Sequence, residues 1–379
     1  MVILDRYLLR QFMQNFLACF ISLTGLYVVV DLVGNVDDFM KTSNEHGSFW
    51  AIVGEYYGYR TIGFFDRTSG ILTLIAAMFT MAMFQRFNEL TAIQAAGIPK
   101  WRIIKPIIIA VLVITALAAA NRELVIANVR DRYTRNAQDL FGEMGKKMDQ
   151  TRDLLTEVLI GGKRTFANRQ RIEAASFTLR GKIDTQFGRQ ISADDAFYQP
   201  ADKNHPGGYL LKGVTVPKDL AVKPSAGNET ETIIYTPLEN GSWLAANECF
   251  IKSDVTFEQL ASRADFRAYA SLGELVDGLK NPSLGFGADM RTAIHARIVQ
   301  PFLDVTLLFL GLPLILARTN RNMFFAIGLC VGVVVMFYMV VLGCQFLGSS
   351  YLVSPTLAAW LPIFIFVPAA VWMSEPLRE

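Results

Sequence analysis

The stretch FNELTAIQAAGIPKWRI, residues 87–103, lies between two long apolar runs, and the rest of the fold can be worked out from it. It is too polar to cross a membrane and too short to form a domain. Asn88 is a good helix N-cap, and Glu89 in the first turn suits the helix dipole. Gly97 can end the helix, and Pro99 prevents its continuation. The sequence therefore predicts a short helix with defined ends between two membrane spans.

The surface of this short helix leaves two interpretations open. Leu90, Ile93 and Ala96 form one apolar stripe at helical spacing, and Ala92 and Ala95 add little side chain beside it. In the simpler interpretation the helix only connects two spans. In the other it inserts into a groove on a cytoplasmic partner, as amphipathic helices do. A membrane protein with no ATP site of its own would need such a contact to receive mechanical work.

The composition points to a membrane protein. Of 379 residues, 52% are hydrophobic and 18% are charged, whereas soluble proteins keep about a quarter of their residues charged. Crossing about 30 Å of hydrocarbon takes about 20 apolar residues in a helix. Six runs approach or exceed that length, and they are residues 11–33, 68–84, 103–120, 298–317, 323–347 and 353–373.

The distribution of basic residues predicts which side of the membrane each loop faces. Cytoplasmic loops carry an excess of Lys and Arg. Basic residues precede the first span and follow the second and fourth spans, whereas the segment after the first span is acidic. We therefore expect a multi-pass membrane protein with both termini in the cytoplasm and the segment between spans three and four outside. The basic residues are Arg6, Arg10, Arg86, Lys100, Arg102, Lys105, Arg318 and Arg321, and the acidic ones are Asp31, Asp37, Asp38, Glu45 and Glu55.

Three regions follow from these patterns. Residues 1–121 are expected to hold an interfacial N-terminal helix, with Leu4, Tyr7, Leu8 and Phe12 on its apolar face, then three spans and the short helix. Residues 122–295 are expected to form an outer domain, and residues 296–379 the last three spans. The predicted fold class is a polytopic α-helical membrane protein with six transmembrane helices and an inserted all-β domain, either a sandwich or a jelly roll.

The outer segment changes from helical to strand-like composition after Thr156. Short runs rich in β-branched and aromatic residues alternate with Gly, Pro, Asn and Asp, which predicts strands joined by loops. A helix then follows at 271–281, where Ser271 and Glu274 make a capping box. Such a β-domain could present a groove for an apolar ligand or a neighbouring strand, or it could be a self-contained insertion. The strand-like runs are RTFANR (164–169), YLLKGVTV (209–216), ETIIYTPL (231–238) and WLAANECFIKSDVTF (243–257).

The chain has no pattern that suggests covalent chemistry. Its four cysteines form no CxxC pair, and its three histidines lie far apart in sequence, so no metal site is expected. The GGKRT run at 161–165 fails the phosphate-loop pattern, because Glu157 and Arg164 stand where Gly and Ser or Thr are needed. We predict that this chain is not an enzyme, binds no cofactor itself and has no nucleic-acid partner.

A few charged residues lie in or beside the predicted spans. Asp304 lies inside the fourth span, where a charge is costly and often functional. It could handle a substrate or a proton, or it could be hydrogen-bonded within the helix bundle. Asp66 and Arg67, at the outer start of the second span, are interpreted as interfacial anchors.

The stretch at 87–103 resembles the signature of the lipopolysaccharide-export permeases, the LptF/LptG family. That signature has an acidic residue, apolar positions, then Ala, a small residue and Gly before a basic restart. The resemblance extends to RYLLRQF (6–12), to the plan of three spans, a domain and three spans, and to SLGELVDGL (271–279). The runs HARIVQPFLDVTLLFLGLPLIL (295–316) and VSPTLAAWLPIFIFVPAAV (353–371) also resemble the family.

The resemblance implies a subunit of an ABC transporter. Two related permeases sit on a dimer of a cytoplasmic ATPase, which binds the ATP. The coupling helix, here about Asn88 to Gly97, fits a groove on that ATPase, with Glu89 at the acidic position and Leu90 and Ile93 on its stripe. A glycolipid, lipopolysaccharide or a relative, is extracted from the inner membrane. The outer β-jelly roll passes it to a periplasmic bridge toward the outer membrane.

One departure from the family pattern concerns the first span. Members can carry a basic residue near its outer end, where it meets lipid phosphates. Here no Lys or Arg lies between Arg10 and Lys41, and Asp31 stands in that region. Arg60 and Arg67 are the alternative sources of positive charge. The residues proposed to line a lipid cavity or gate are Asp31, Arg60, Arg67 and Asp304.

Two other functions are carried as alternatives. One is an ion- or proton-coupled secondary transporter that uses Asp304 and needs no ATPase. The other is a mechanotransmitting permease whose outer domain drives a periplasmic partner. The usual plan for the second has one span before the outer domain, whereas this chain has three.

Overall fold

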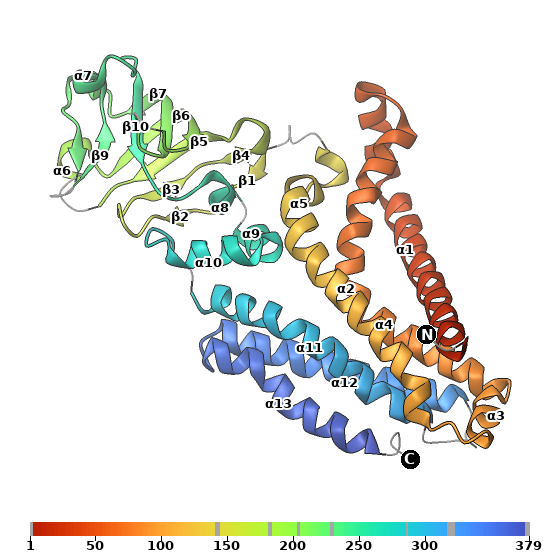
Figure 1. The fold of residues 1–379 in the computed structure, drawn as a ribbon. Helices are drawn as coiled ribbons and strands as arrows, with labels where there is room; N and C mark the ends of the chain where they lie inside the picture. The colour runs from red at the N-terminus through yellow and green to blue at the C-terminus, as the bar shows by residue number, and fades with distance from the viewer. Residues whose placement is uncertain are drawn as a thin grey trace. The chain divides into compact units, whose positions relative to one another are not determined.

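The computed structural model describes residues 3–140, 145–180, 184–202, 205–227, 231–261, 263–285, 287–316 and 323–375. The chain divides into two compact units (Figure 1). The membrane unit comprises Met1–Tyr133 and Gly287–Glu379, and the β unit comprises Thr134–Phe286. Each unit is described here by itself.

The membrane unit contains the six predicted spans. Within the described residues, six helices are long and apolar enough to cross a membrane. The third of them runs on from α4 through a π-helical segment, η1, into α5. These elements are α1 (Ile3–His46), α2 (Phe49–Arg86), α4 (Lys100–Ala120), η1 (Asn121–Ile126), α5 (Ala127–Tyr133), α11 (Ala288–Leu316), α12 (Met323–Ser349) and α13 (Pro355–Met373).

The first two helices differ from the prediction. The helix α1 has 44 residues, which at 1.5 Å each is about 66 Å, far more than a bilayer core needs. Only Gly47, with φ of 127°, and Ser48 separate it from α2. The expected acidic loop is therefore wrong, because Asp31, Asp37 and Asp38 lie on α1 itself. The expected separate interfacial helix is the first part of α1.

The helices of the membrane unit pack around one apolar core. Leu8 and Phe12 of α1, Leu72 and Met81 of α2 and Leu307 of α11 are almost fully buried in it. Small residues allow close approach, as membrane helices require when no hydrophobic effect drives them together. A Cβ on Gly311 of α11 would lie only 2.4 Å from Leu74 Cδ1 of α2.

The β unit is built on one antiparallel sheet. Its strand order is β1-β4-β5-β6-β7-β10-β9-β8, and β2 and β3 pair beside β5. This confirms the predicted β-domain inserted between helices. The strands are β1 (Lys146–Lys147), β2 (Thr151–Arg152), β3 (Leu159–Gly161), β4 (Arg164–Phe166), β5 (Arg171–Thr178), β6 (Gln190–Gln199), β7 (Gly208–Val216), β8 (Ala226–Gly227), β9 (Thr232–Tyr235) and β10 (Glu248–Lys252).

Four of these strands fall within the predicted runs, but the two long central ones, β5 and β6, were not predicted. In β5 the buried side chains are Ile172, Ala175 and Phe177, so the alternation expected of a strand is interrupted. The cause is Ala174, whose φ of 47° lies in the left-handed region.

Short helices complete the β unit. The helix α10 begins with the predicted capping box, in which Glu274 N donates to Ser271 Oγ and Ser271 N donates to Glu274 Oε2. The helical segments are η2 (Ala137–Asp139), η3 (Ala167–Arg169), α6 (Asp184–Phe187), η5 (Leu220–Val222), α7 (Pro237–Asn240), α8 (Phe257–Ala261), α9 (Arg263–Tyr269) and α10 (Leu272–Lys280).

The unit boundaries differ from the predicted ones. The β unit begins at Thr134 rather than at 122, because η1 and α5 continue α4 and contact α2. It ends at Phe286 rather than at 295, because α11 already starts at Ala288. The predicted basic residues Arg318 and Arg321 lie outside the described residues.

Candidate functional site

The short helix predicted at the outset is α3 (Glu89–Ala95). Its N-terminal residue Asn88 has φ of 59° and its side chain makes no capping bond, so the predicted side-chain cap is wrong. The left-handed backbone places Asn88 as a turn residue, a conformation that Asn tolerates better than most residues. Its carbonyl oxygen still accepts from Ala92 N at 3.0 Å.

The C-terminus of α3 confirms the predicted stop at Gly97. Gly97 has φ of 78°, where a side chain would be strained. Its N–H donates to Gln94 O at 2.9 Å, and Ile98 N donates to Ile93 O at 3.3 Å. These two bonds make a Schellman motif, in which Ile93 and Ile98 also share the apolar side.

The two faces of α3 have different surroundings. Leu90 is 7% exposed within the core of the membrane unit, and Ile93 and Ile98 pack against that core. The predicted stripe thus holds α3 to its own bundle, apart from Ala96, which is exposed. The outward face carries small side chains, namely Thr91, Ala92, Ala95 and Ala96.

Glu89 joins α3 to the beginning of α1. Tyr7 Oη donates to both carboxylate oxygens of Glu89, at 3.3 and 3.4 Å. The start of α1 therefore lies at the end of the membrane unit that carries α3 (Figure 1).

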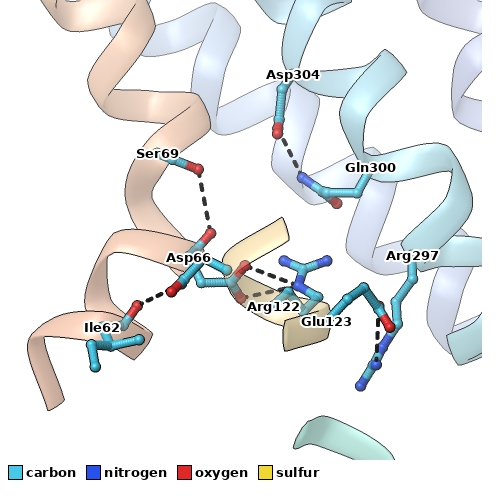
Figure 2. A network of polar contacts seen from close by, with 9 residues as sticks. Ile62, Asp66, Ser69, Arg122, Glu123, Arg297, Gln300 and Asp304 are labelled. Atoms are coloured by element: carbon cyan, nitrogen blue, oxygen red, sulfur yellow. Dashed lines mark hydrogen bonds and ion pairs between the residues drawn. The ribbon is translucent and has the colours of Figure 1, made fainter. Parts of the chain in front are cut away.

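A second polar region lies among α2, η1 and α11 (Figure 2). Arg122 Nε contacts both oxygens of Asp66 at 3.0 Å, and both side chains are mostly buried. Beside them, Asn121 Nδ2 donates to Ile62 O at 3.1 Å. Arg122 and Asn121 come from the π-helical segment, and such segments are frequent at functional sites.

The same region continues onto α11. Arg297 forms an ion pair with Glu123 at 3.8 Å, and Gln300 Nε2 donates to Asp304 Oδ1 at 2.9 Å (Figure 2). Asp304 is 6% exposed and lies directly against α2, since a Cβ on Gly70 would be 2.5 Å from Asp304 Oδ1. The carboxylate predicted inside span four is thus held at a helix–helix contact.

Two other candidate residues, Asp31 and Arg60, meet around tyrosine rings of α2. Tyr57 Oη donates to Asp31 Oδ2 at 2.8 Å, and the Arg60 guanidinium lies over the rings of Tyr56 and Tyr133, at 5.0 and 5.6 Å. Since Tyr56 and Tyr57 contact each other, Asp31 and Arg60 belong to one aromatic cluster. Arg67 is exposed on α2.

A family model described as lipopolysaccharide export system permease LptF/LptG matches residues 6–375. The chain belongs to the LptF/LptG family. No individual curated protein matches its sequence.

Family membership makes this protein a permease of lipopolysaccharide export, that is, a membrane transporter component. The short helix α3 and the polar region around η1 differ in what they can do. The exposed face of α3 can receive another protein. The ion pairs around η1 link three membrane helices, so they can hold or change the arrangement of α2, α4 and α11 in the permease.

Sequence reasoning missed most of the second region. Asp66 was interpreted as an interfacial anchor, but it is 12% exposed and paired with Arg122. Arg122, Glu123 and Arg297 lie just outside the predicted spans, where hydropathy alone suggests solvent, and Gln300 lies in the first turn of the predicted fourth span. The available signal was charge balance, because two carboxylates and two cations lie next to the ends of spans two, three and four, namely Asp66, Glu123, Arg122 and Arg297.

Proposed function

We propose that this permease is a subunit of an ABC transporter that extracts lipopolysaccharide or a related glycolipid from the inner membrane. A cytoplasmic ATPase dimer hydrolyses the ATP, a second related permease completes the membrane channel, and this chain binds no cofactor itself. The β unit lies in the periplasm and passes the lipid to bridge proteins toward the outer membrane. Family membership supports the lipid class.

The observation that carries the proposal is the construction of α3. Seven residues form a helix whose inner face is fixed in the bundle core and whose ends are set by two left-handed residues, Asn88 and Gly97. Its exposed face has only small side chains, so a partner groove can approach the backbone closely. A push on α3 is transmitted to the spans, because Leu90 and Ile93 pack against the core of the bundle.

The proposed lipid contacts are Arg60 and Arg67. Arg67 is exposed, and Arg60 is half-buried among aromatic rings, where a guanidinium can still meet a phosphate. Asp31 lies in the same aromatic cluster and is tied to Tyr57, which lowers its repulsion of an anionic head group. Asp304 is assigned to the helix contact with Gly70 rather than to lipid.

The test uses the purified transporter in proteoliposomes. Glu89→Ala removes the contact with Tyr7, and Gly97→Leu forces a side chain into a left-handed backbone without any steric clash, since nothing lies within 4 Å of that Cβ. We expect the double variant to release at least roughly tenfold less lipid for each ATP that is hydrolysed. A tenfold change in this ratio corresponds to about 1.4 kcal/mol. The measurement is lipid release and phosphate release in the same sample.

Matched controls separate coupling from folding. Gly54→Leu makes the same change at a helical glycine with open space around it and no positive φ, and its coupling should equal that of the native chain. Asp304→Asn tests the alternative transporter, in which transport depends on this carboxylate and needs no ATP. Full ATP-independent transport in the Glu89→Ala, Gly97→Leu chain, together with its loss in Asp304→Asn, would reject the ABC assignment.

A further inference from the structure

The membrane unit contains an open cavity that neither α3 nor the polar region uses. Its volume is about 660 Å³, within the range of pockets that hold small organic ligands. It lies between the start of α4, the middle of α11 and the last turns of α13, and its walls include Trp101, Phe309 and Val371. Because Pro99 also lines it, the cavity opens at the end of the bundle that carries α3.

The cavity suits hydrocarbon rather than a polar ligand. Two of its lining residues carry hydroxyl groups, and both hydroxyls are satisfied within their own helices. Thr306 Oγ1 donates to Phe302 O at 2.7 Å, and Ser374 Oγ donates to Val371 O at 2.8 Å. A sugar or nucleotide would lose its hydrogen bonds to water here without replacement, whereas an acyl chain loses none.

Two cations of α4 lie close in sequence to Trp101, which lines the cavity. Arg102 follows Trp101 directly, and Lys105 lies one turn further on the same helix face as Trp101. Both cations are exposed, and the rim also holds the N-terminus of the 21-residue helix α4, whose dipole favours an anion. The half-exposed indole of Trp101 is typical of a side chain at the boundary between lipid and water.

We infer that this cavity binds an anionic phospholipid of the cytoplasmic leaflet, with an acyl chain between α4, α11 and α13 and the phosphate at Arg102 and Lys105. Basic pockets between membrane helices on the cytoplasmic side are known to select acidic lipids. The inference goes beyond the proposed function, from which it takes only that this end of the bundle faces the cytoplasm. The bound lipid lies beside Pro99, two residues after Gly97, so it supports the segment that fixes α3.

The experiment measures lipid binding by the full-length protein in mild detergent. Phosphatidylglycerol and phosphatidylcholine with the same acyl chains are titrated in turn, and bound lipid is counted by native mass spectrometry. We expect phosphatidylglycerol to bind more tightly. Arg102→Gln with Lys105→Gln should weaken it roughly 30-fold, the ratio that corresponds to about 2 kcal/mol for two interfacial cations.

Two further variants keep the test independent of the charge argument. Val371→Trp fills the cavity from a position that is 58% exposed, so it should expel the lipid without overpacking the core. Val335→Trp makes the same change on the exposed face of α12, and Arg6→Gln with Arg10→Gln removes two exposed cations from α1. Both controls should bind phosphatidylglycerol as the native protein does.

Several results would overturn the inference. Equal affinity for the two lipids would show that the site does not select an anionic head group. Unchanged binding in Val371→Trp would show that the cavity is not the site. Loss of a co-purifying ATPase in Val371→Trp with lipid binding intact would show that a protein covers the cavity instead. None of these measurements needs ATP or transported lipid, so failure here is distinguishable from failure of the proposed function.

Discussion

Asp153 in the β unit and Asp304 in the membrane unit are both buried, and they are held in different ways. In the β unit, Asp153 is fully buried and accepts three hydrogen bonds, from Ser253 Oγ at 2.7 Å and from the N–H groups of Leu155 and Thr156 at 3.0 and 3.3 Å. In the membrane unit, Asp304 accepts one hydrogen bond within the described residues, from Gln300.

The difference indicates what each carboxylate is for. A buried carboxylate stabilises a fold only when its oxygens are fully hydrogen-bonded, because desolvation is costly. Asp153 meets that condition and joins the turn after β2 to the residue after β10, so it is structural. Asp304 lies at a contact where α2 has no side chain, and its arrangement depends on how closely α2 and α11 pack.

The largest expected effect comes from Asp153→Ala. Removing the carboxylate leaves three donors without an acceptor, two of them buried, so the β unit should lose about 3 kcal/mol of unfolding free energy. The measurement is hydrogen exchange of the β unit in the full-length protein, read as the free energy of opening. Asp254→Ala, an exposed carboxylate next to Ser253, is the control and should change little. Equal effects of the two variants would contradict the structural role.

A smaller effect is expected from Gly70→Ala in the membrane unit. Its Cβ would lie 2.5 Å from Asp304 Oδ1, so α2 and α11 must separate or the carboxylate must move. Overpacking of this kind costs about 1–3 kcal/mol. Thermal unfolding in detergent measures it, and Gly58→Ala, on the same helix with open space around it, is the control. A Gly70→Ala chain as stable as the control would mean that Asp304 is not confined by α2.

The smallest effect, absent at neutral pH, is an alkaline loss of stability in the β unit. Burial raises the pKa of the Cys249 thiol to about 12, whereas an unfolded cysteine titrates near 8.5. Between these values the unfolded chain loses a proton that the folded chain keeps. Stability is therefore complete below about pH 8.5 and falls above it, by up to about 1.4 kcal/mol per pH unit.

The alkaline effect can be assigned by mutation and by chemistry. Cys249→Ala should remove the contribution of this thiol to the fall in unfolding free energy between about pH 9 and 10. Burial also raises the pKa of Tyr209, which should steepen the fall in unfolding free energy above about pH 10. In the folded protein Cys249 should resist iodoacetamide at pH 8, read by peptide mass spectrometry. Rapid alkylation there would mean that the thiol is accessible, so that burial could neither raise its pKa nor cause the alkaline loss of stability.

The sequence was sufficient for features that depend on local or periodic patterns. Six spans, an inserted β-domain, the stop at Gly97 and the capping box of Ser271 and Glu274 were all predicted and are confirmed. Each rests on residues that act within one turn or one run.

The features that escaped prediction depend on three-dimensional register. The pairing of Asp66 with Arg122 requires that α2 and η1 meet at those residues, which hydropathy does not encode. The strand β5 was missed because Ala174 interrupts its alternation. The length of α1 was missed because acidic residues such as Asp37 suggest a loop, although they are equally compatible with a helix that leaves the hydrocarbon.

The π-helical segment η1 has a consequence for the genetics of this chain. An α-helix turns about 100° per residue, so the widened turn at Asn121–Ile126 sets the rotational phase of everything that follows it. A π-helical turn holds more residues than an α-helical turn, so deleting a single residue there would restore a regular helix and leave α5 close to its present phase, whereas the directions of Arg122 and Glu123 relative to their partners would change. A single-residue deletion in η1 should therefore weaken the ion pairs of Arg122 and Glu123 more than substitutions along α4 do, while α5 keeps its contacts with α2.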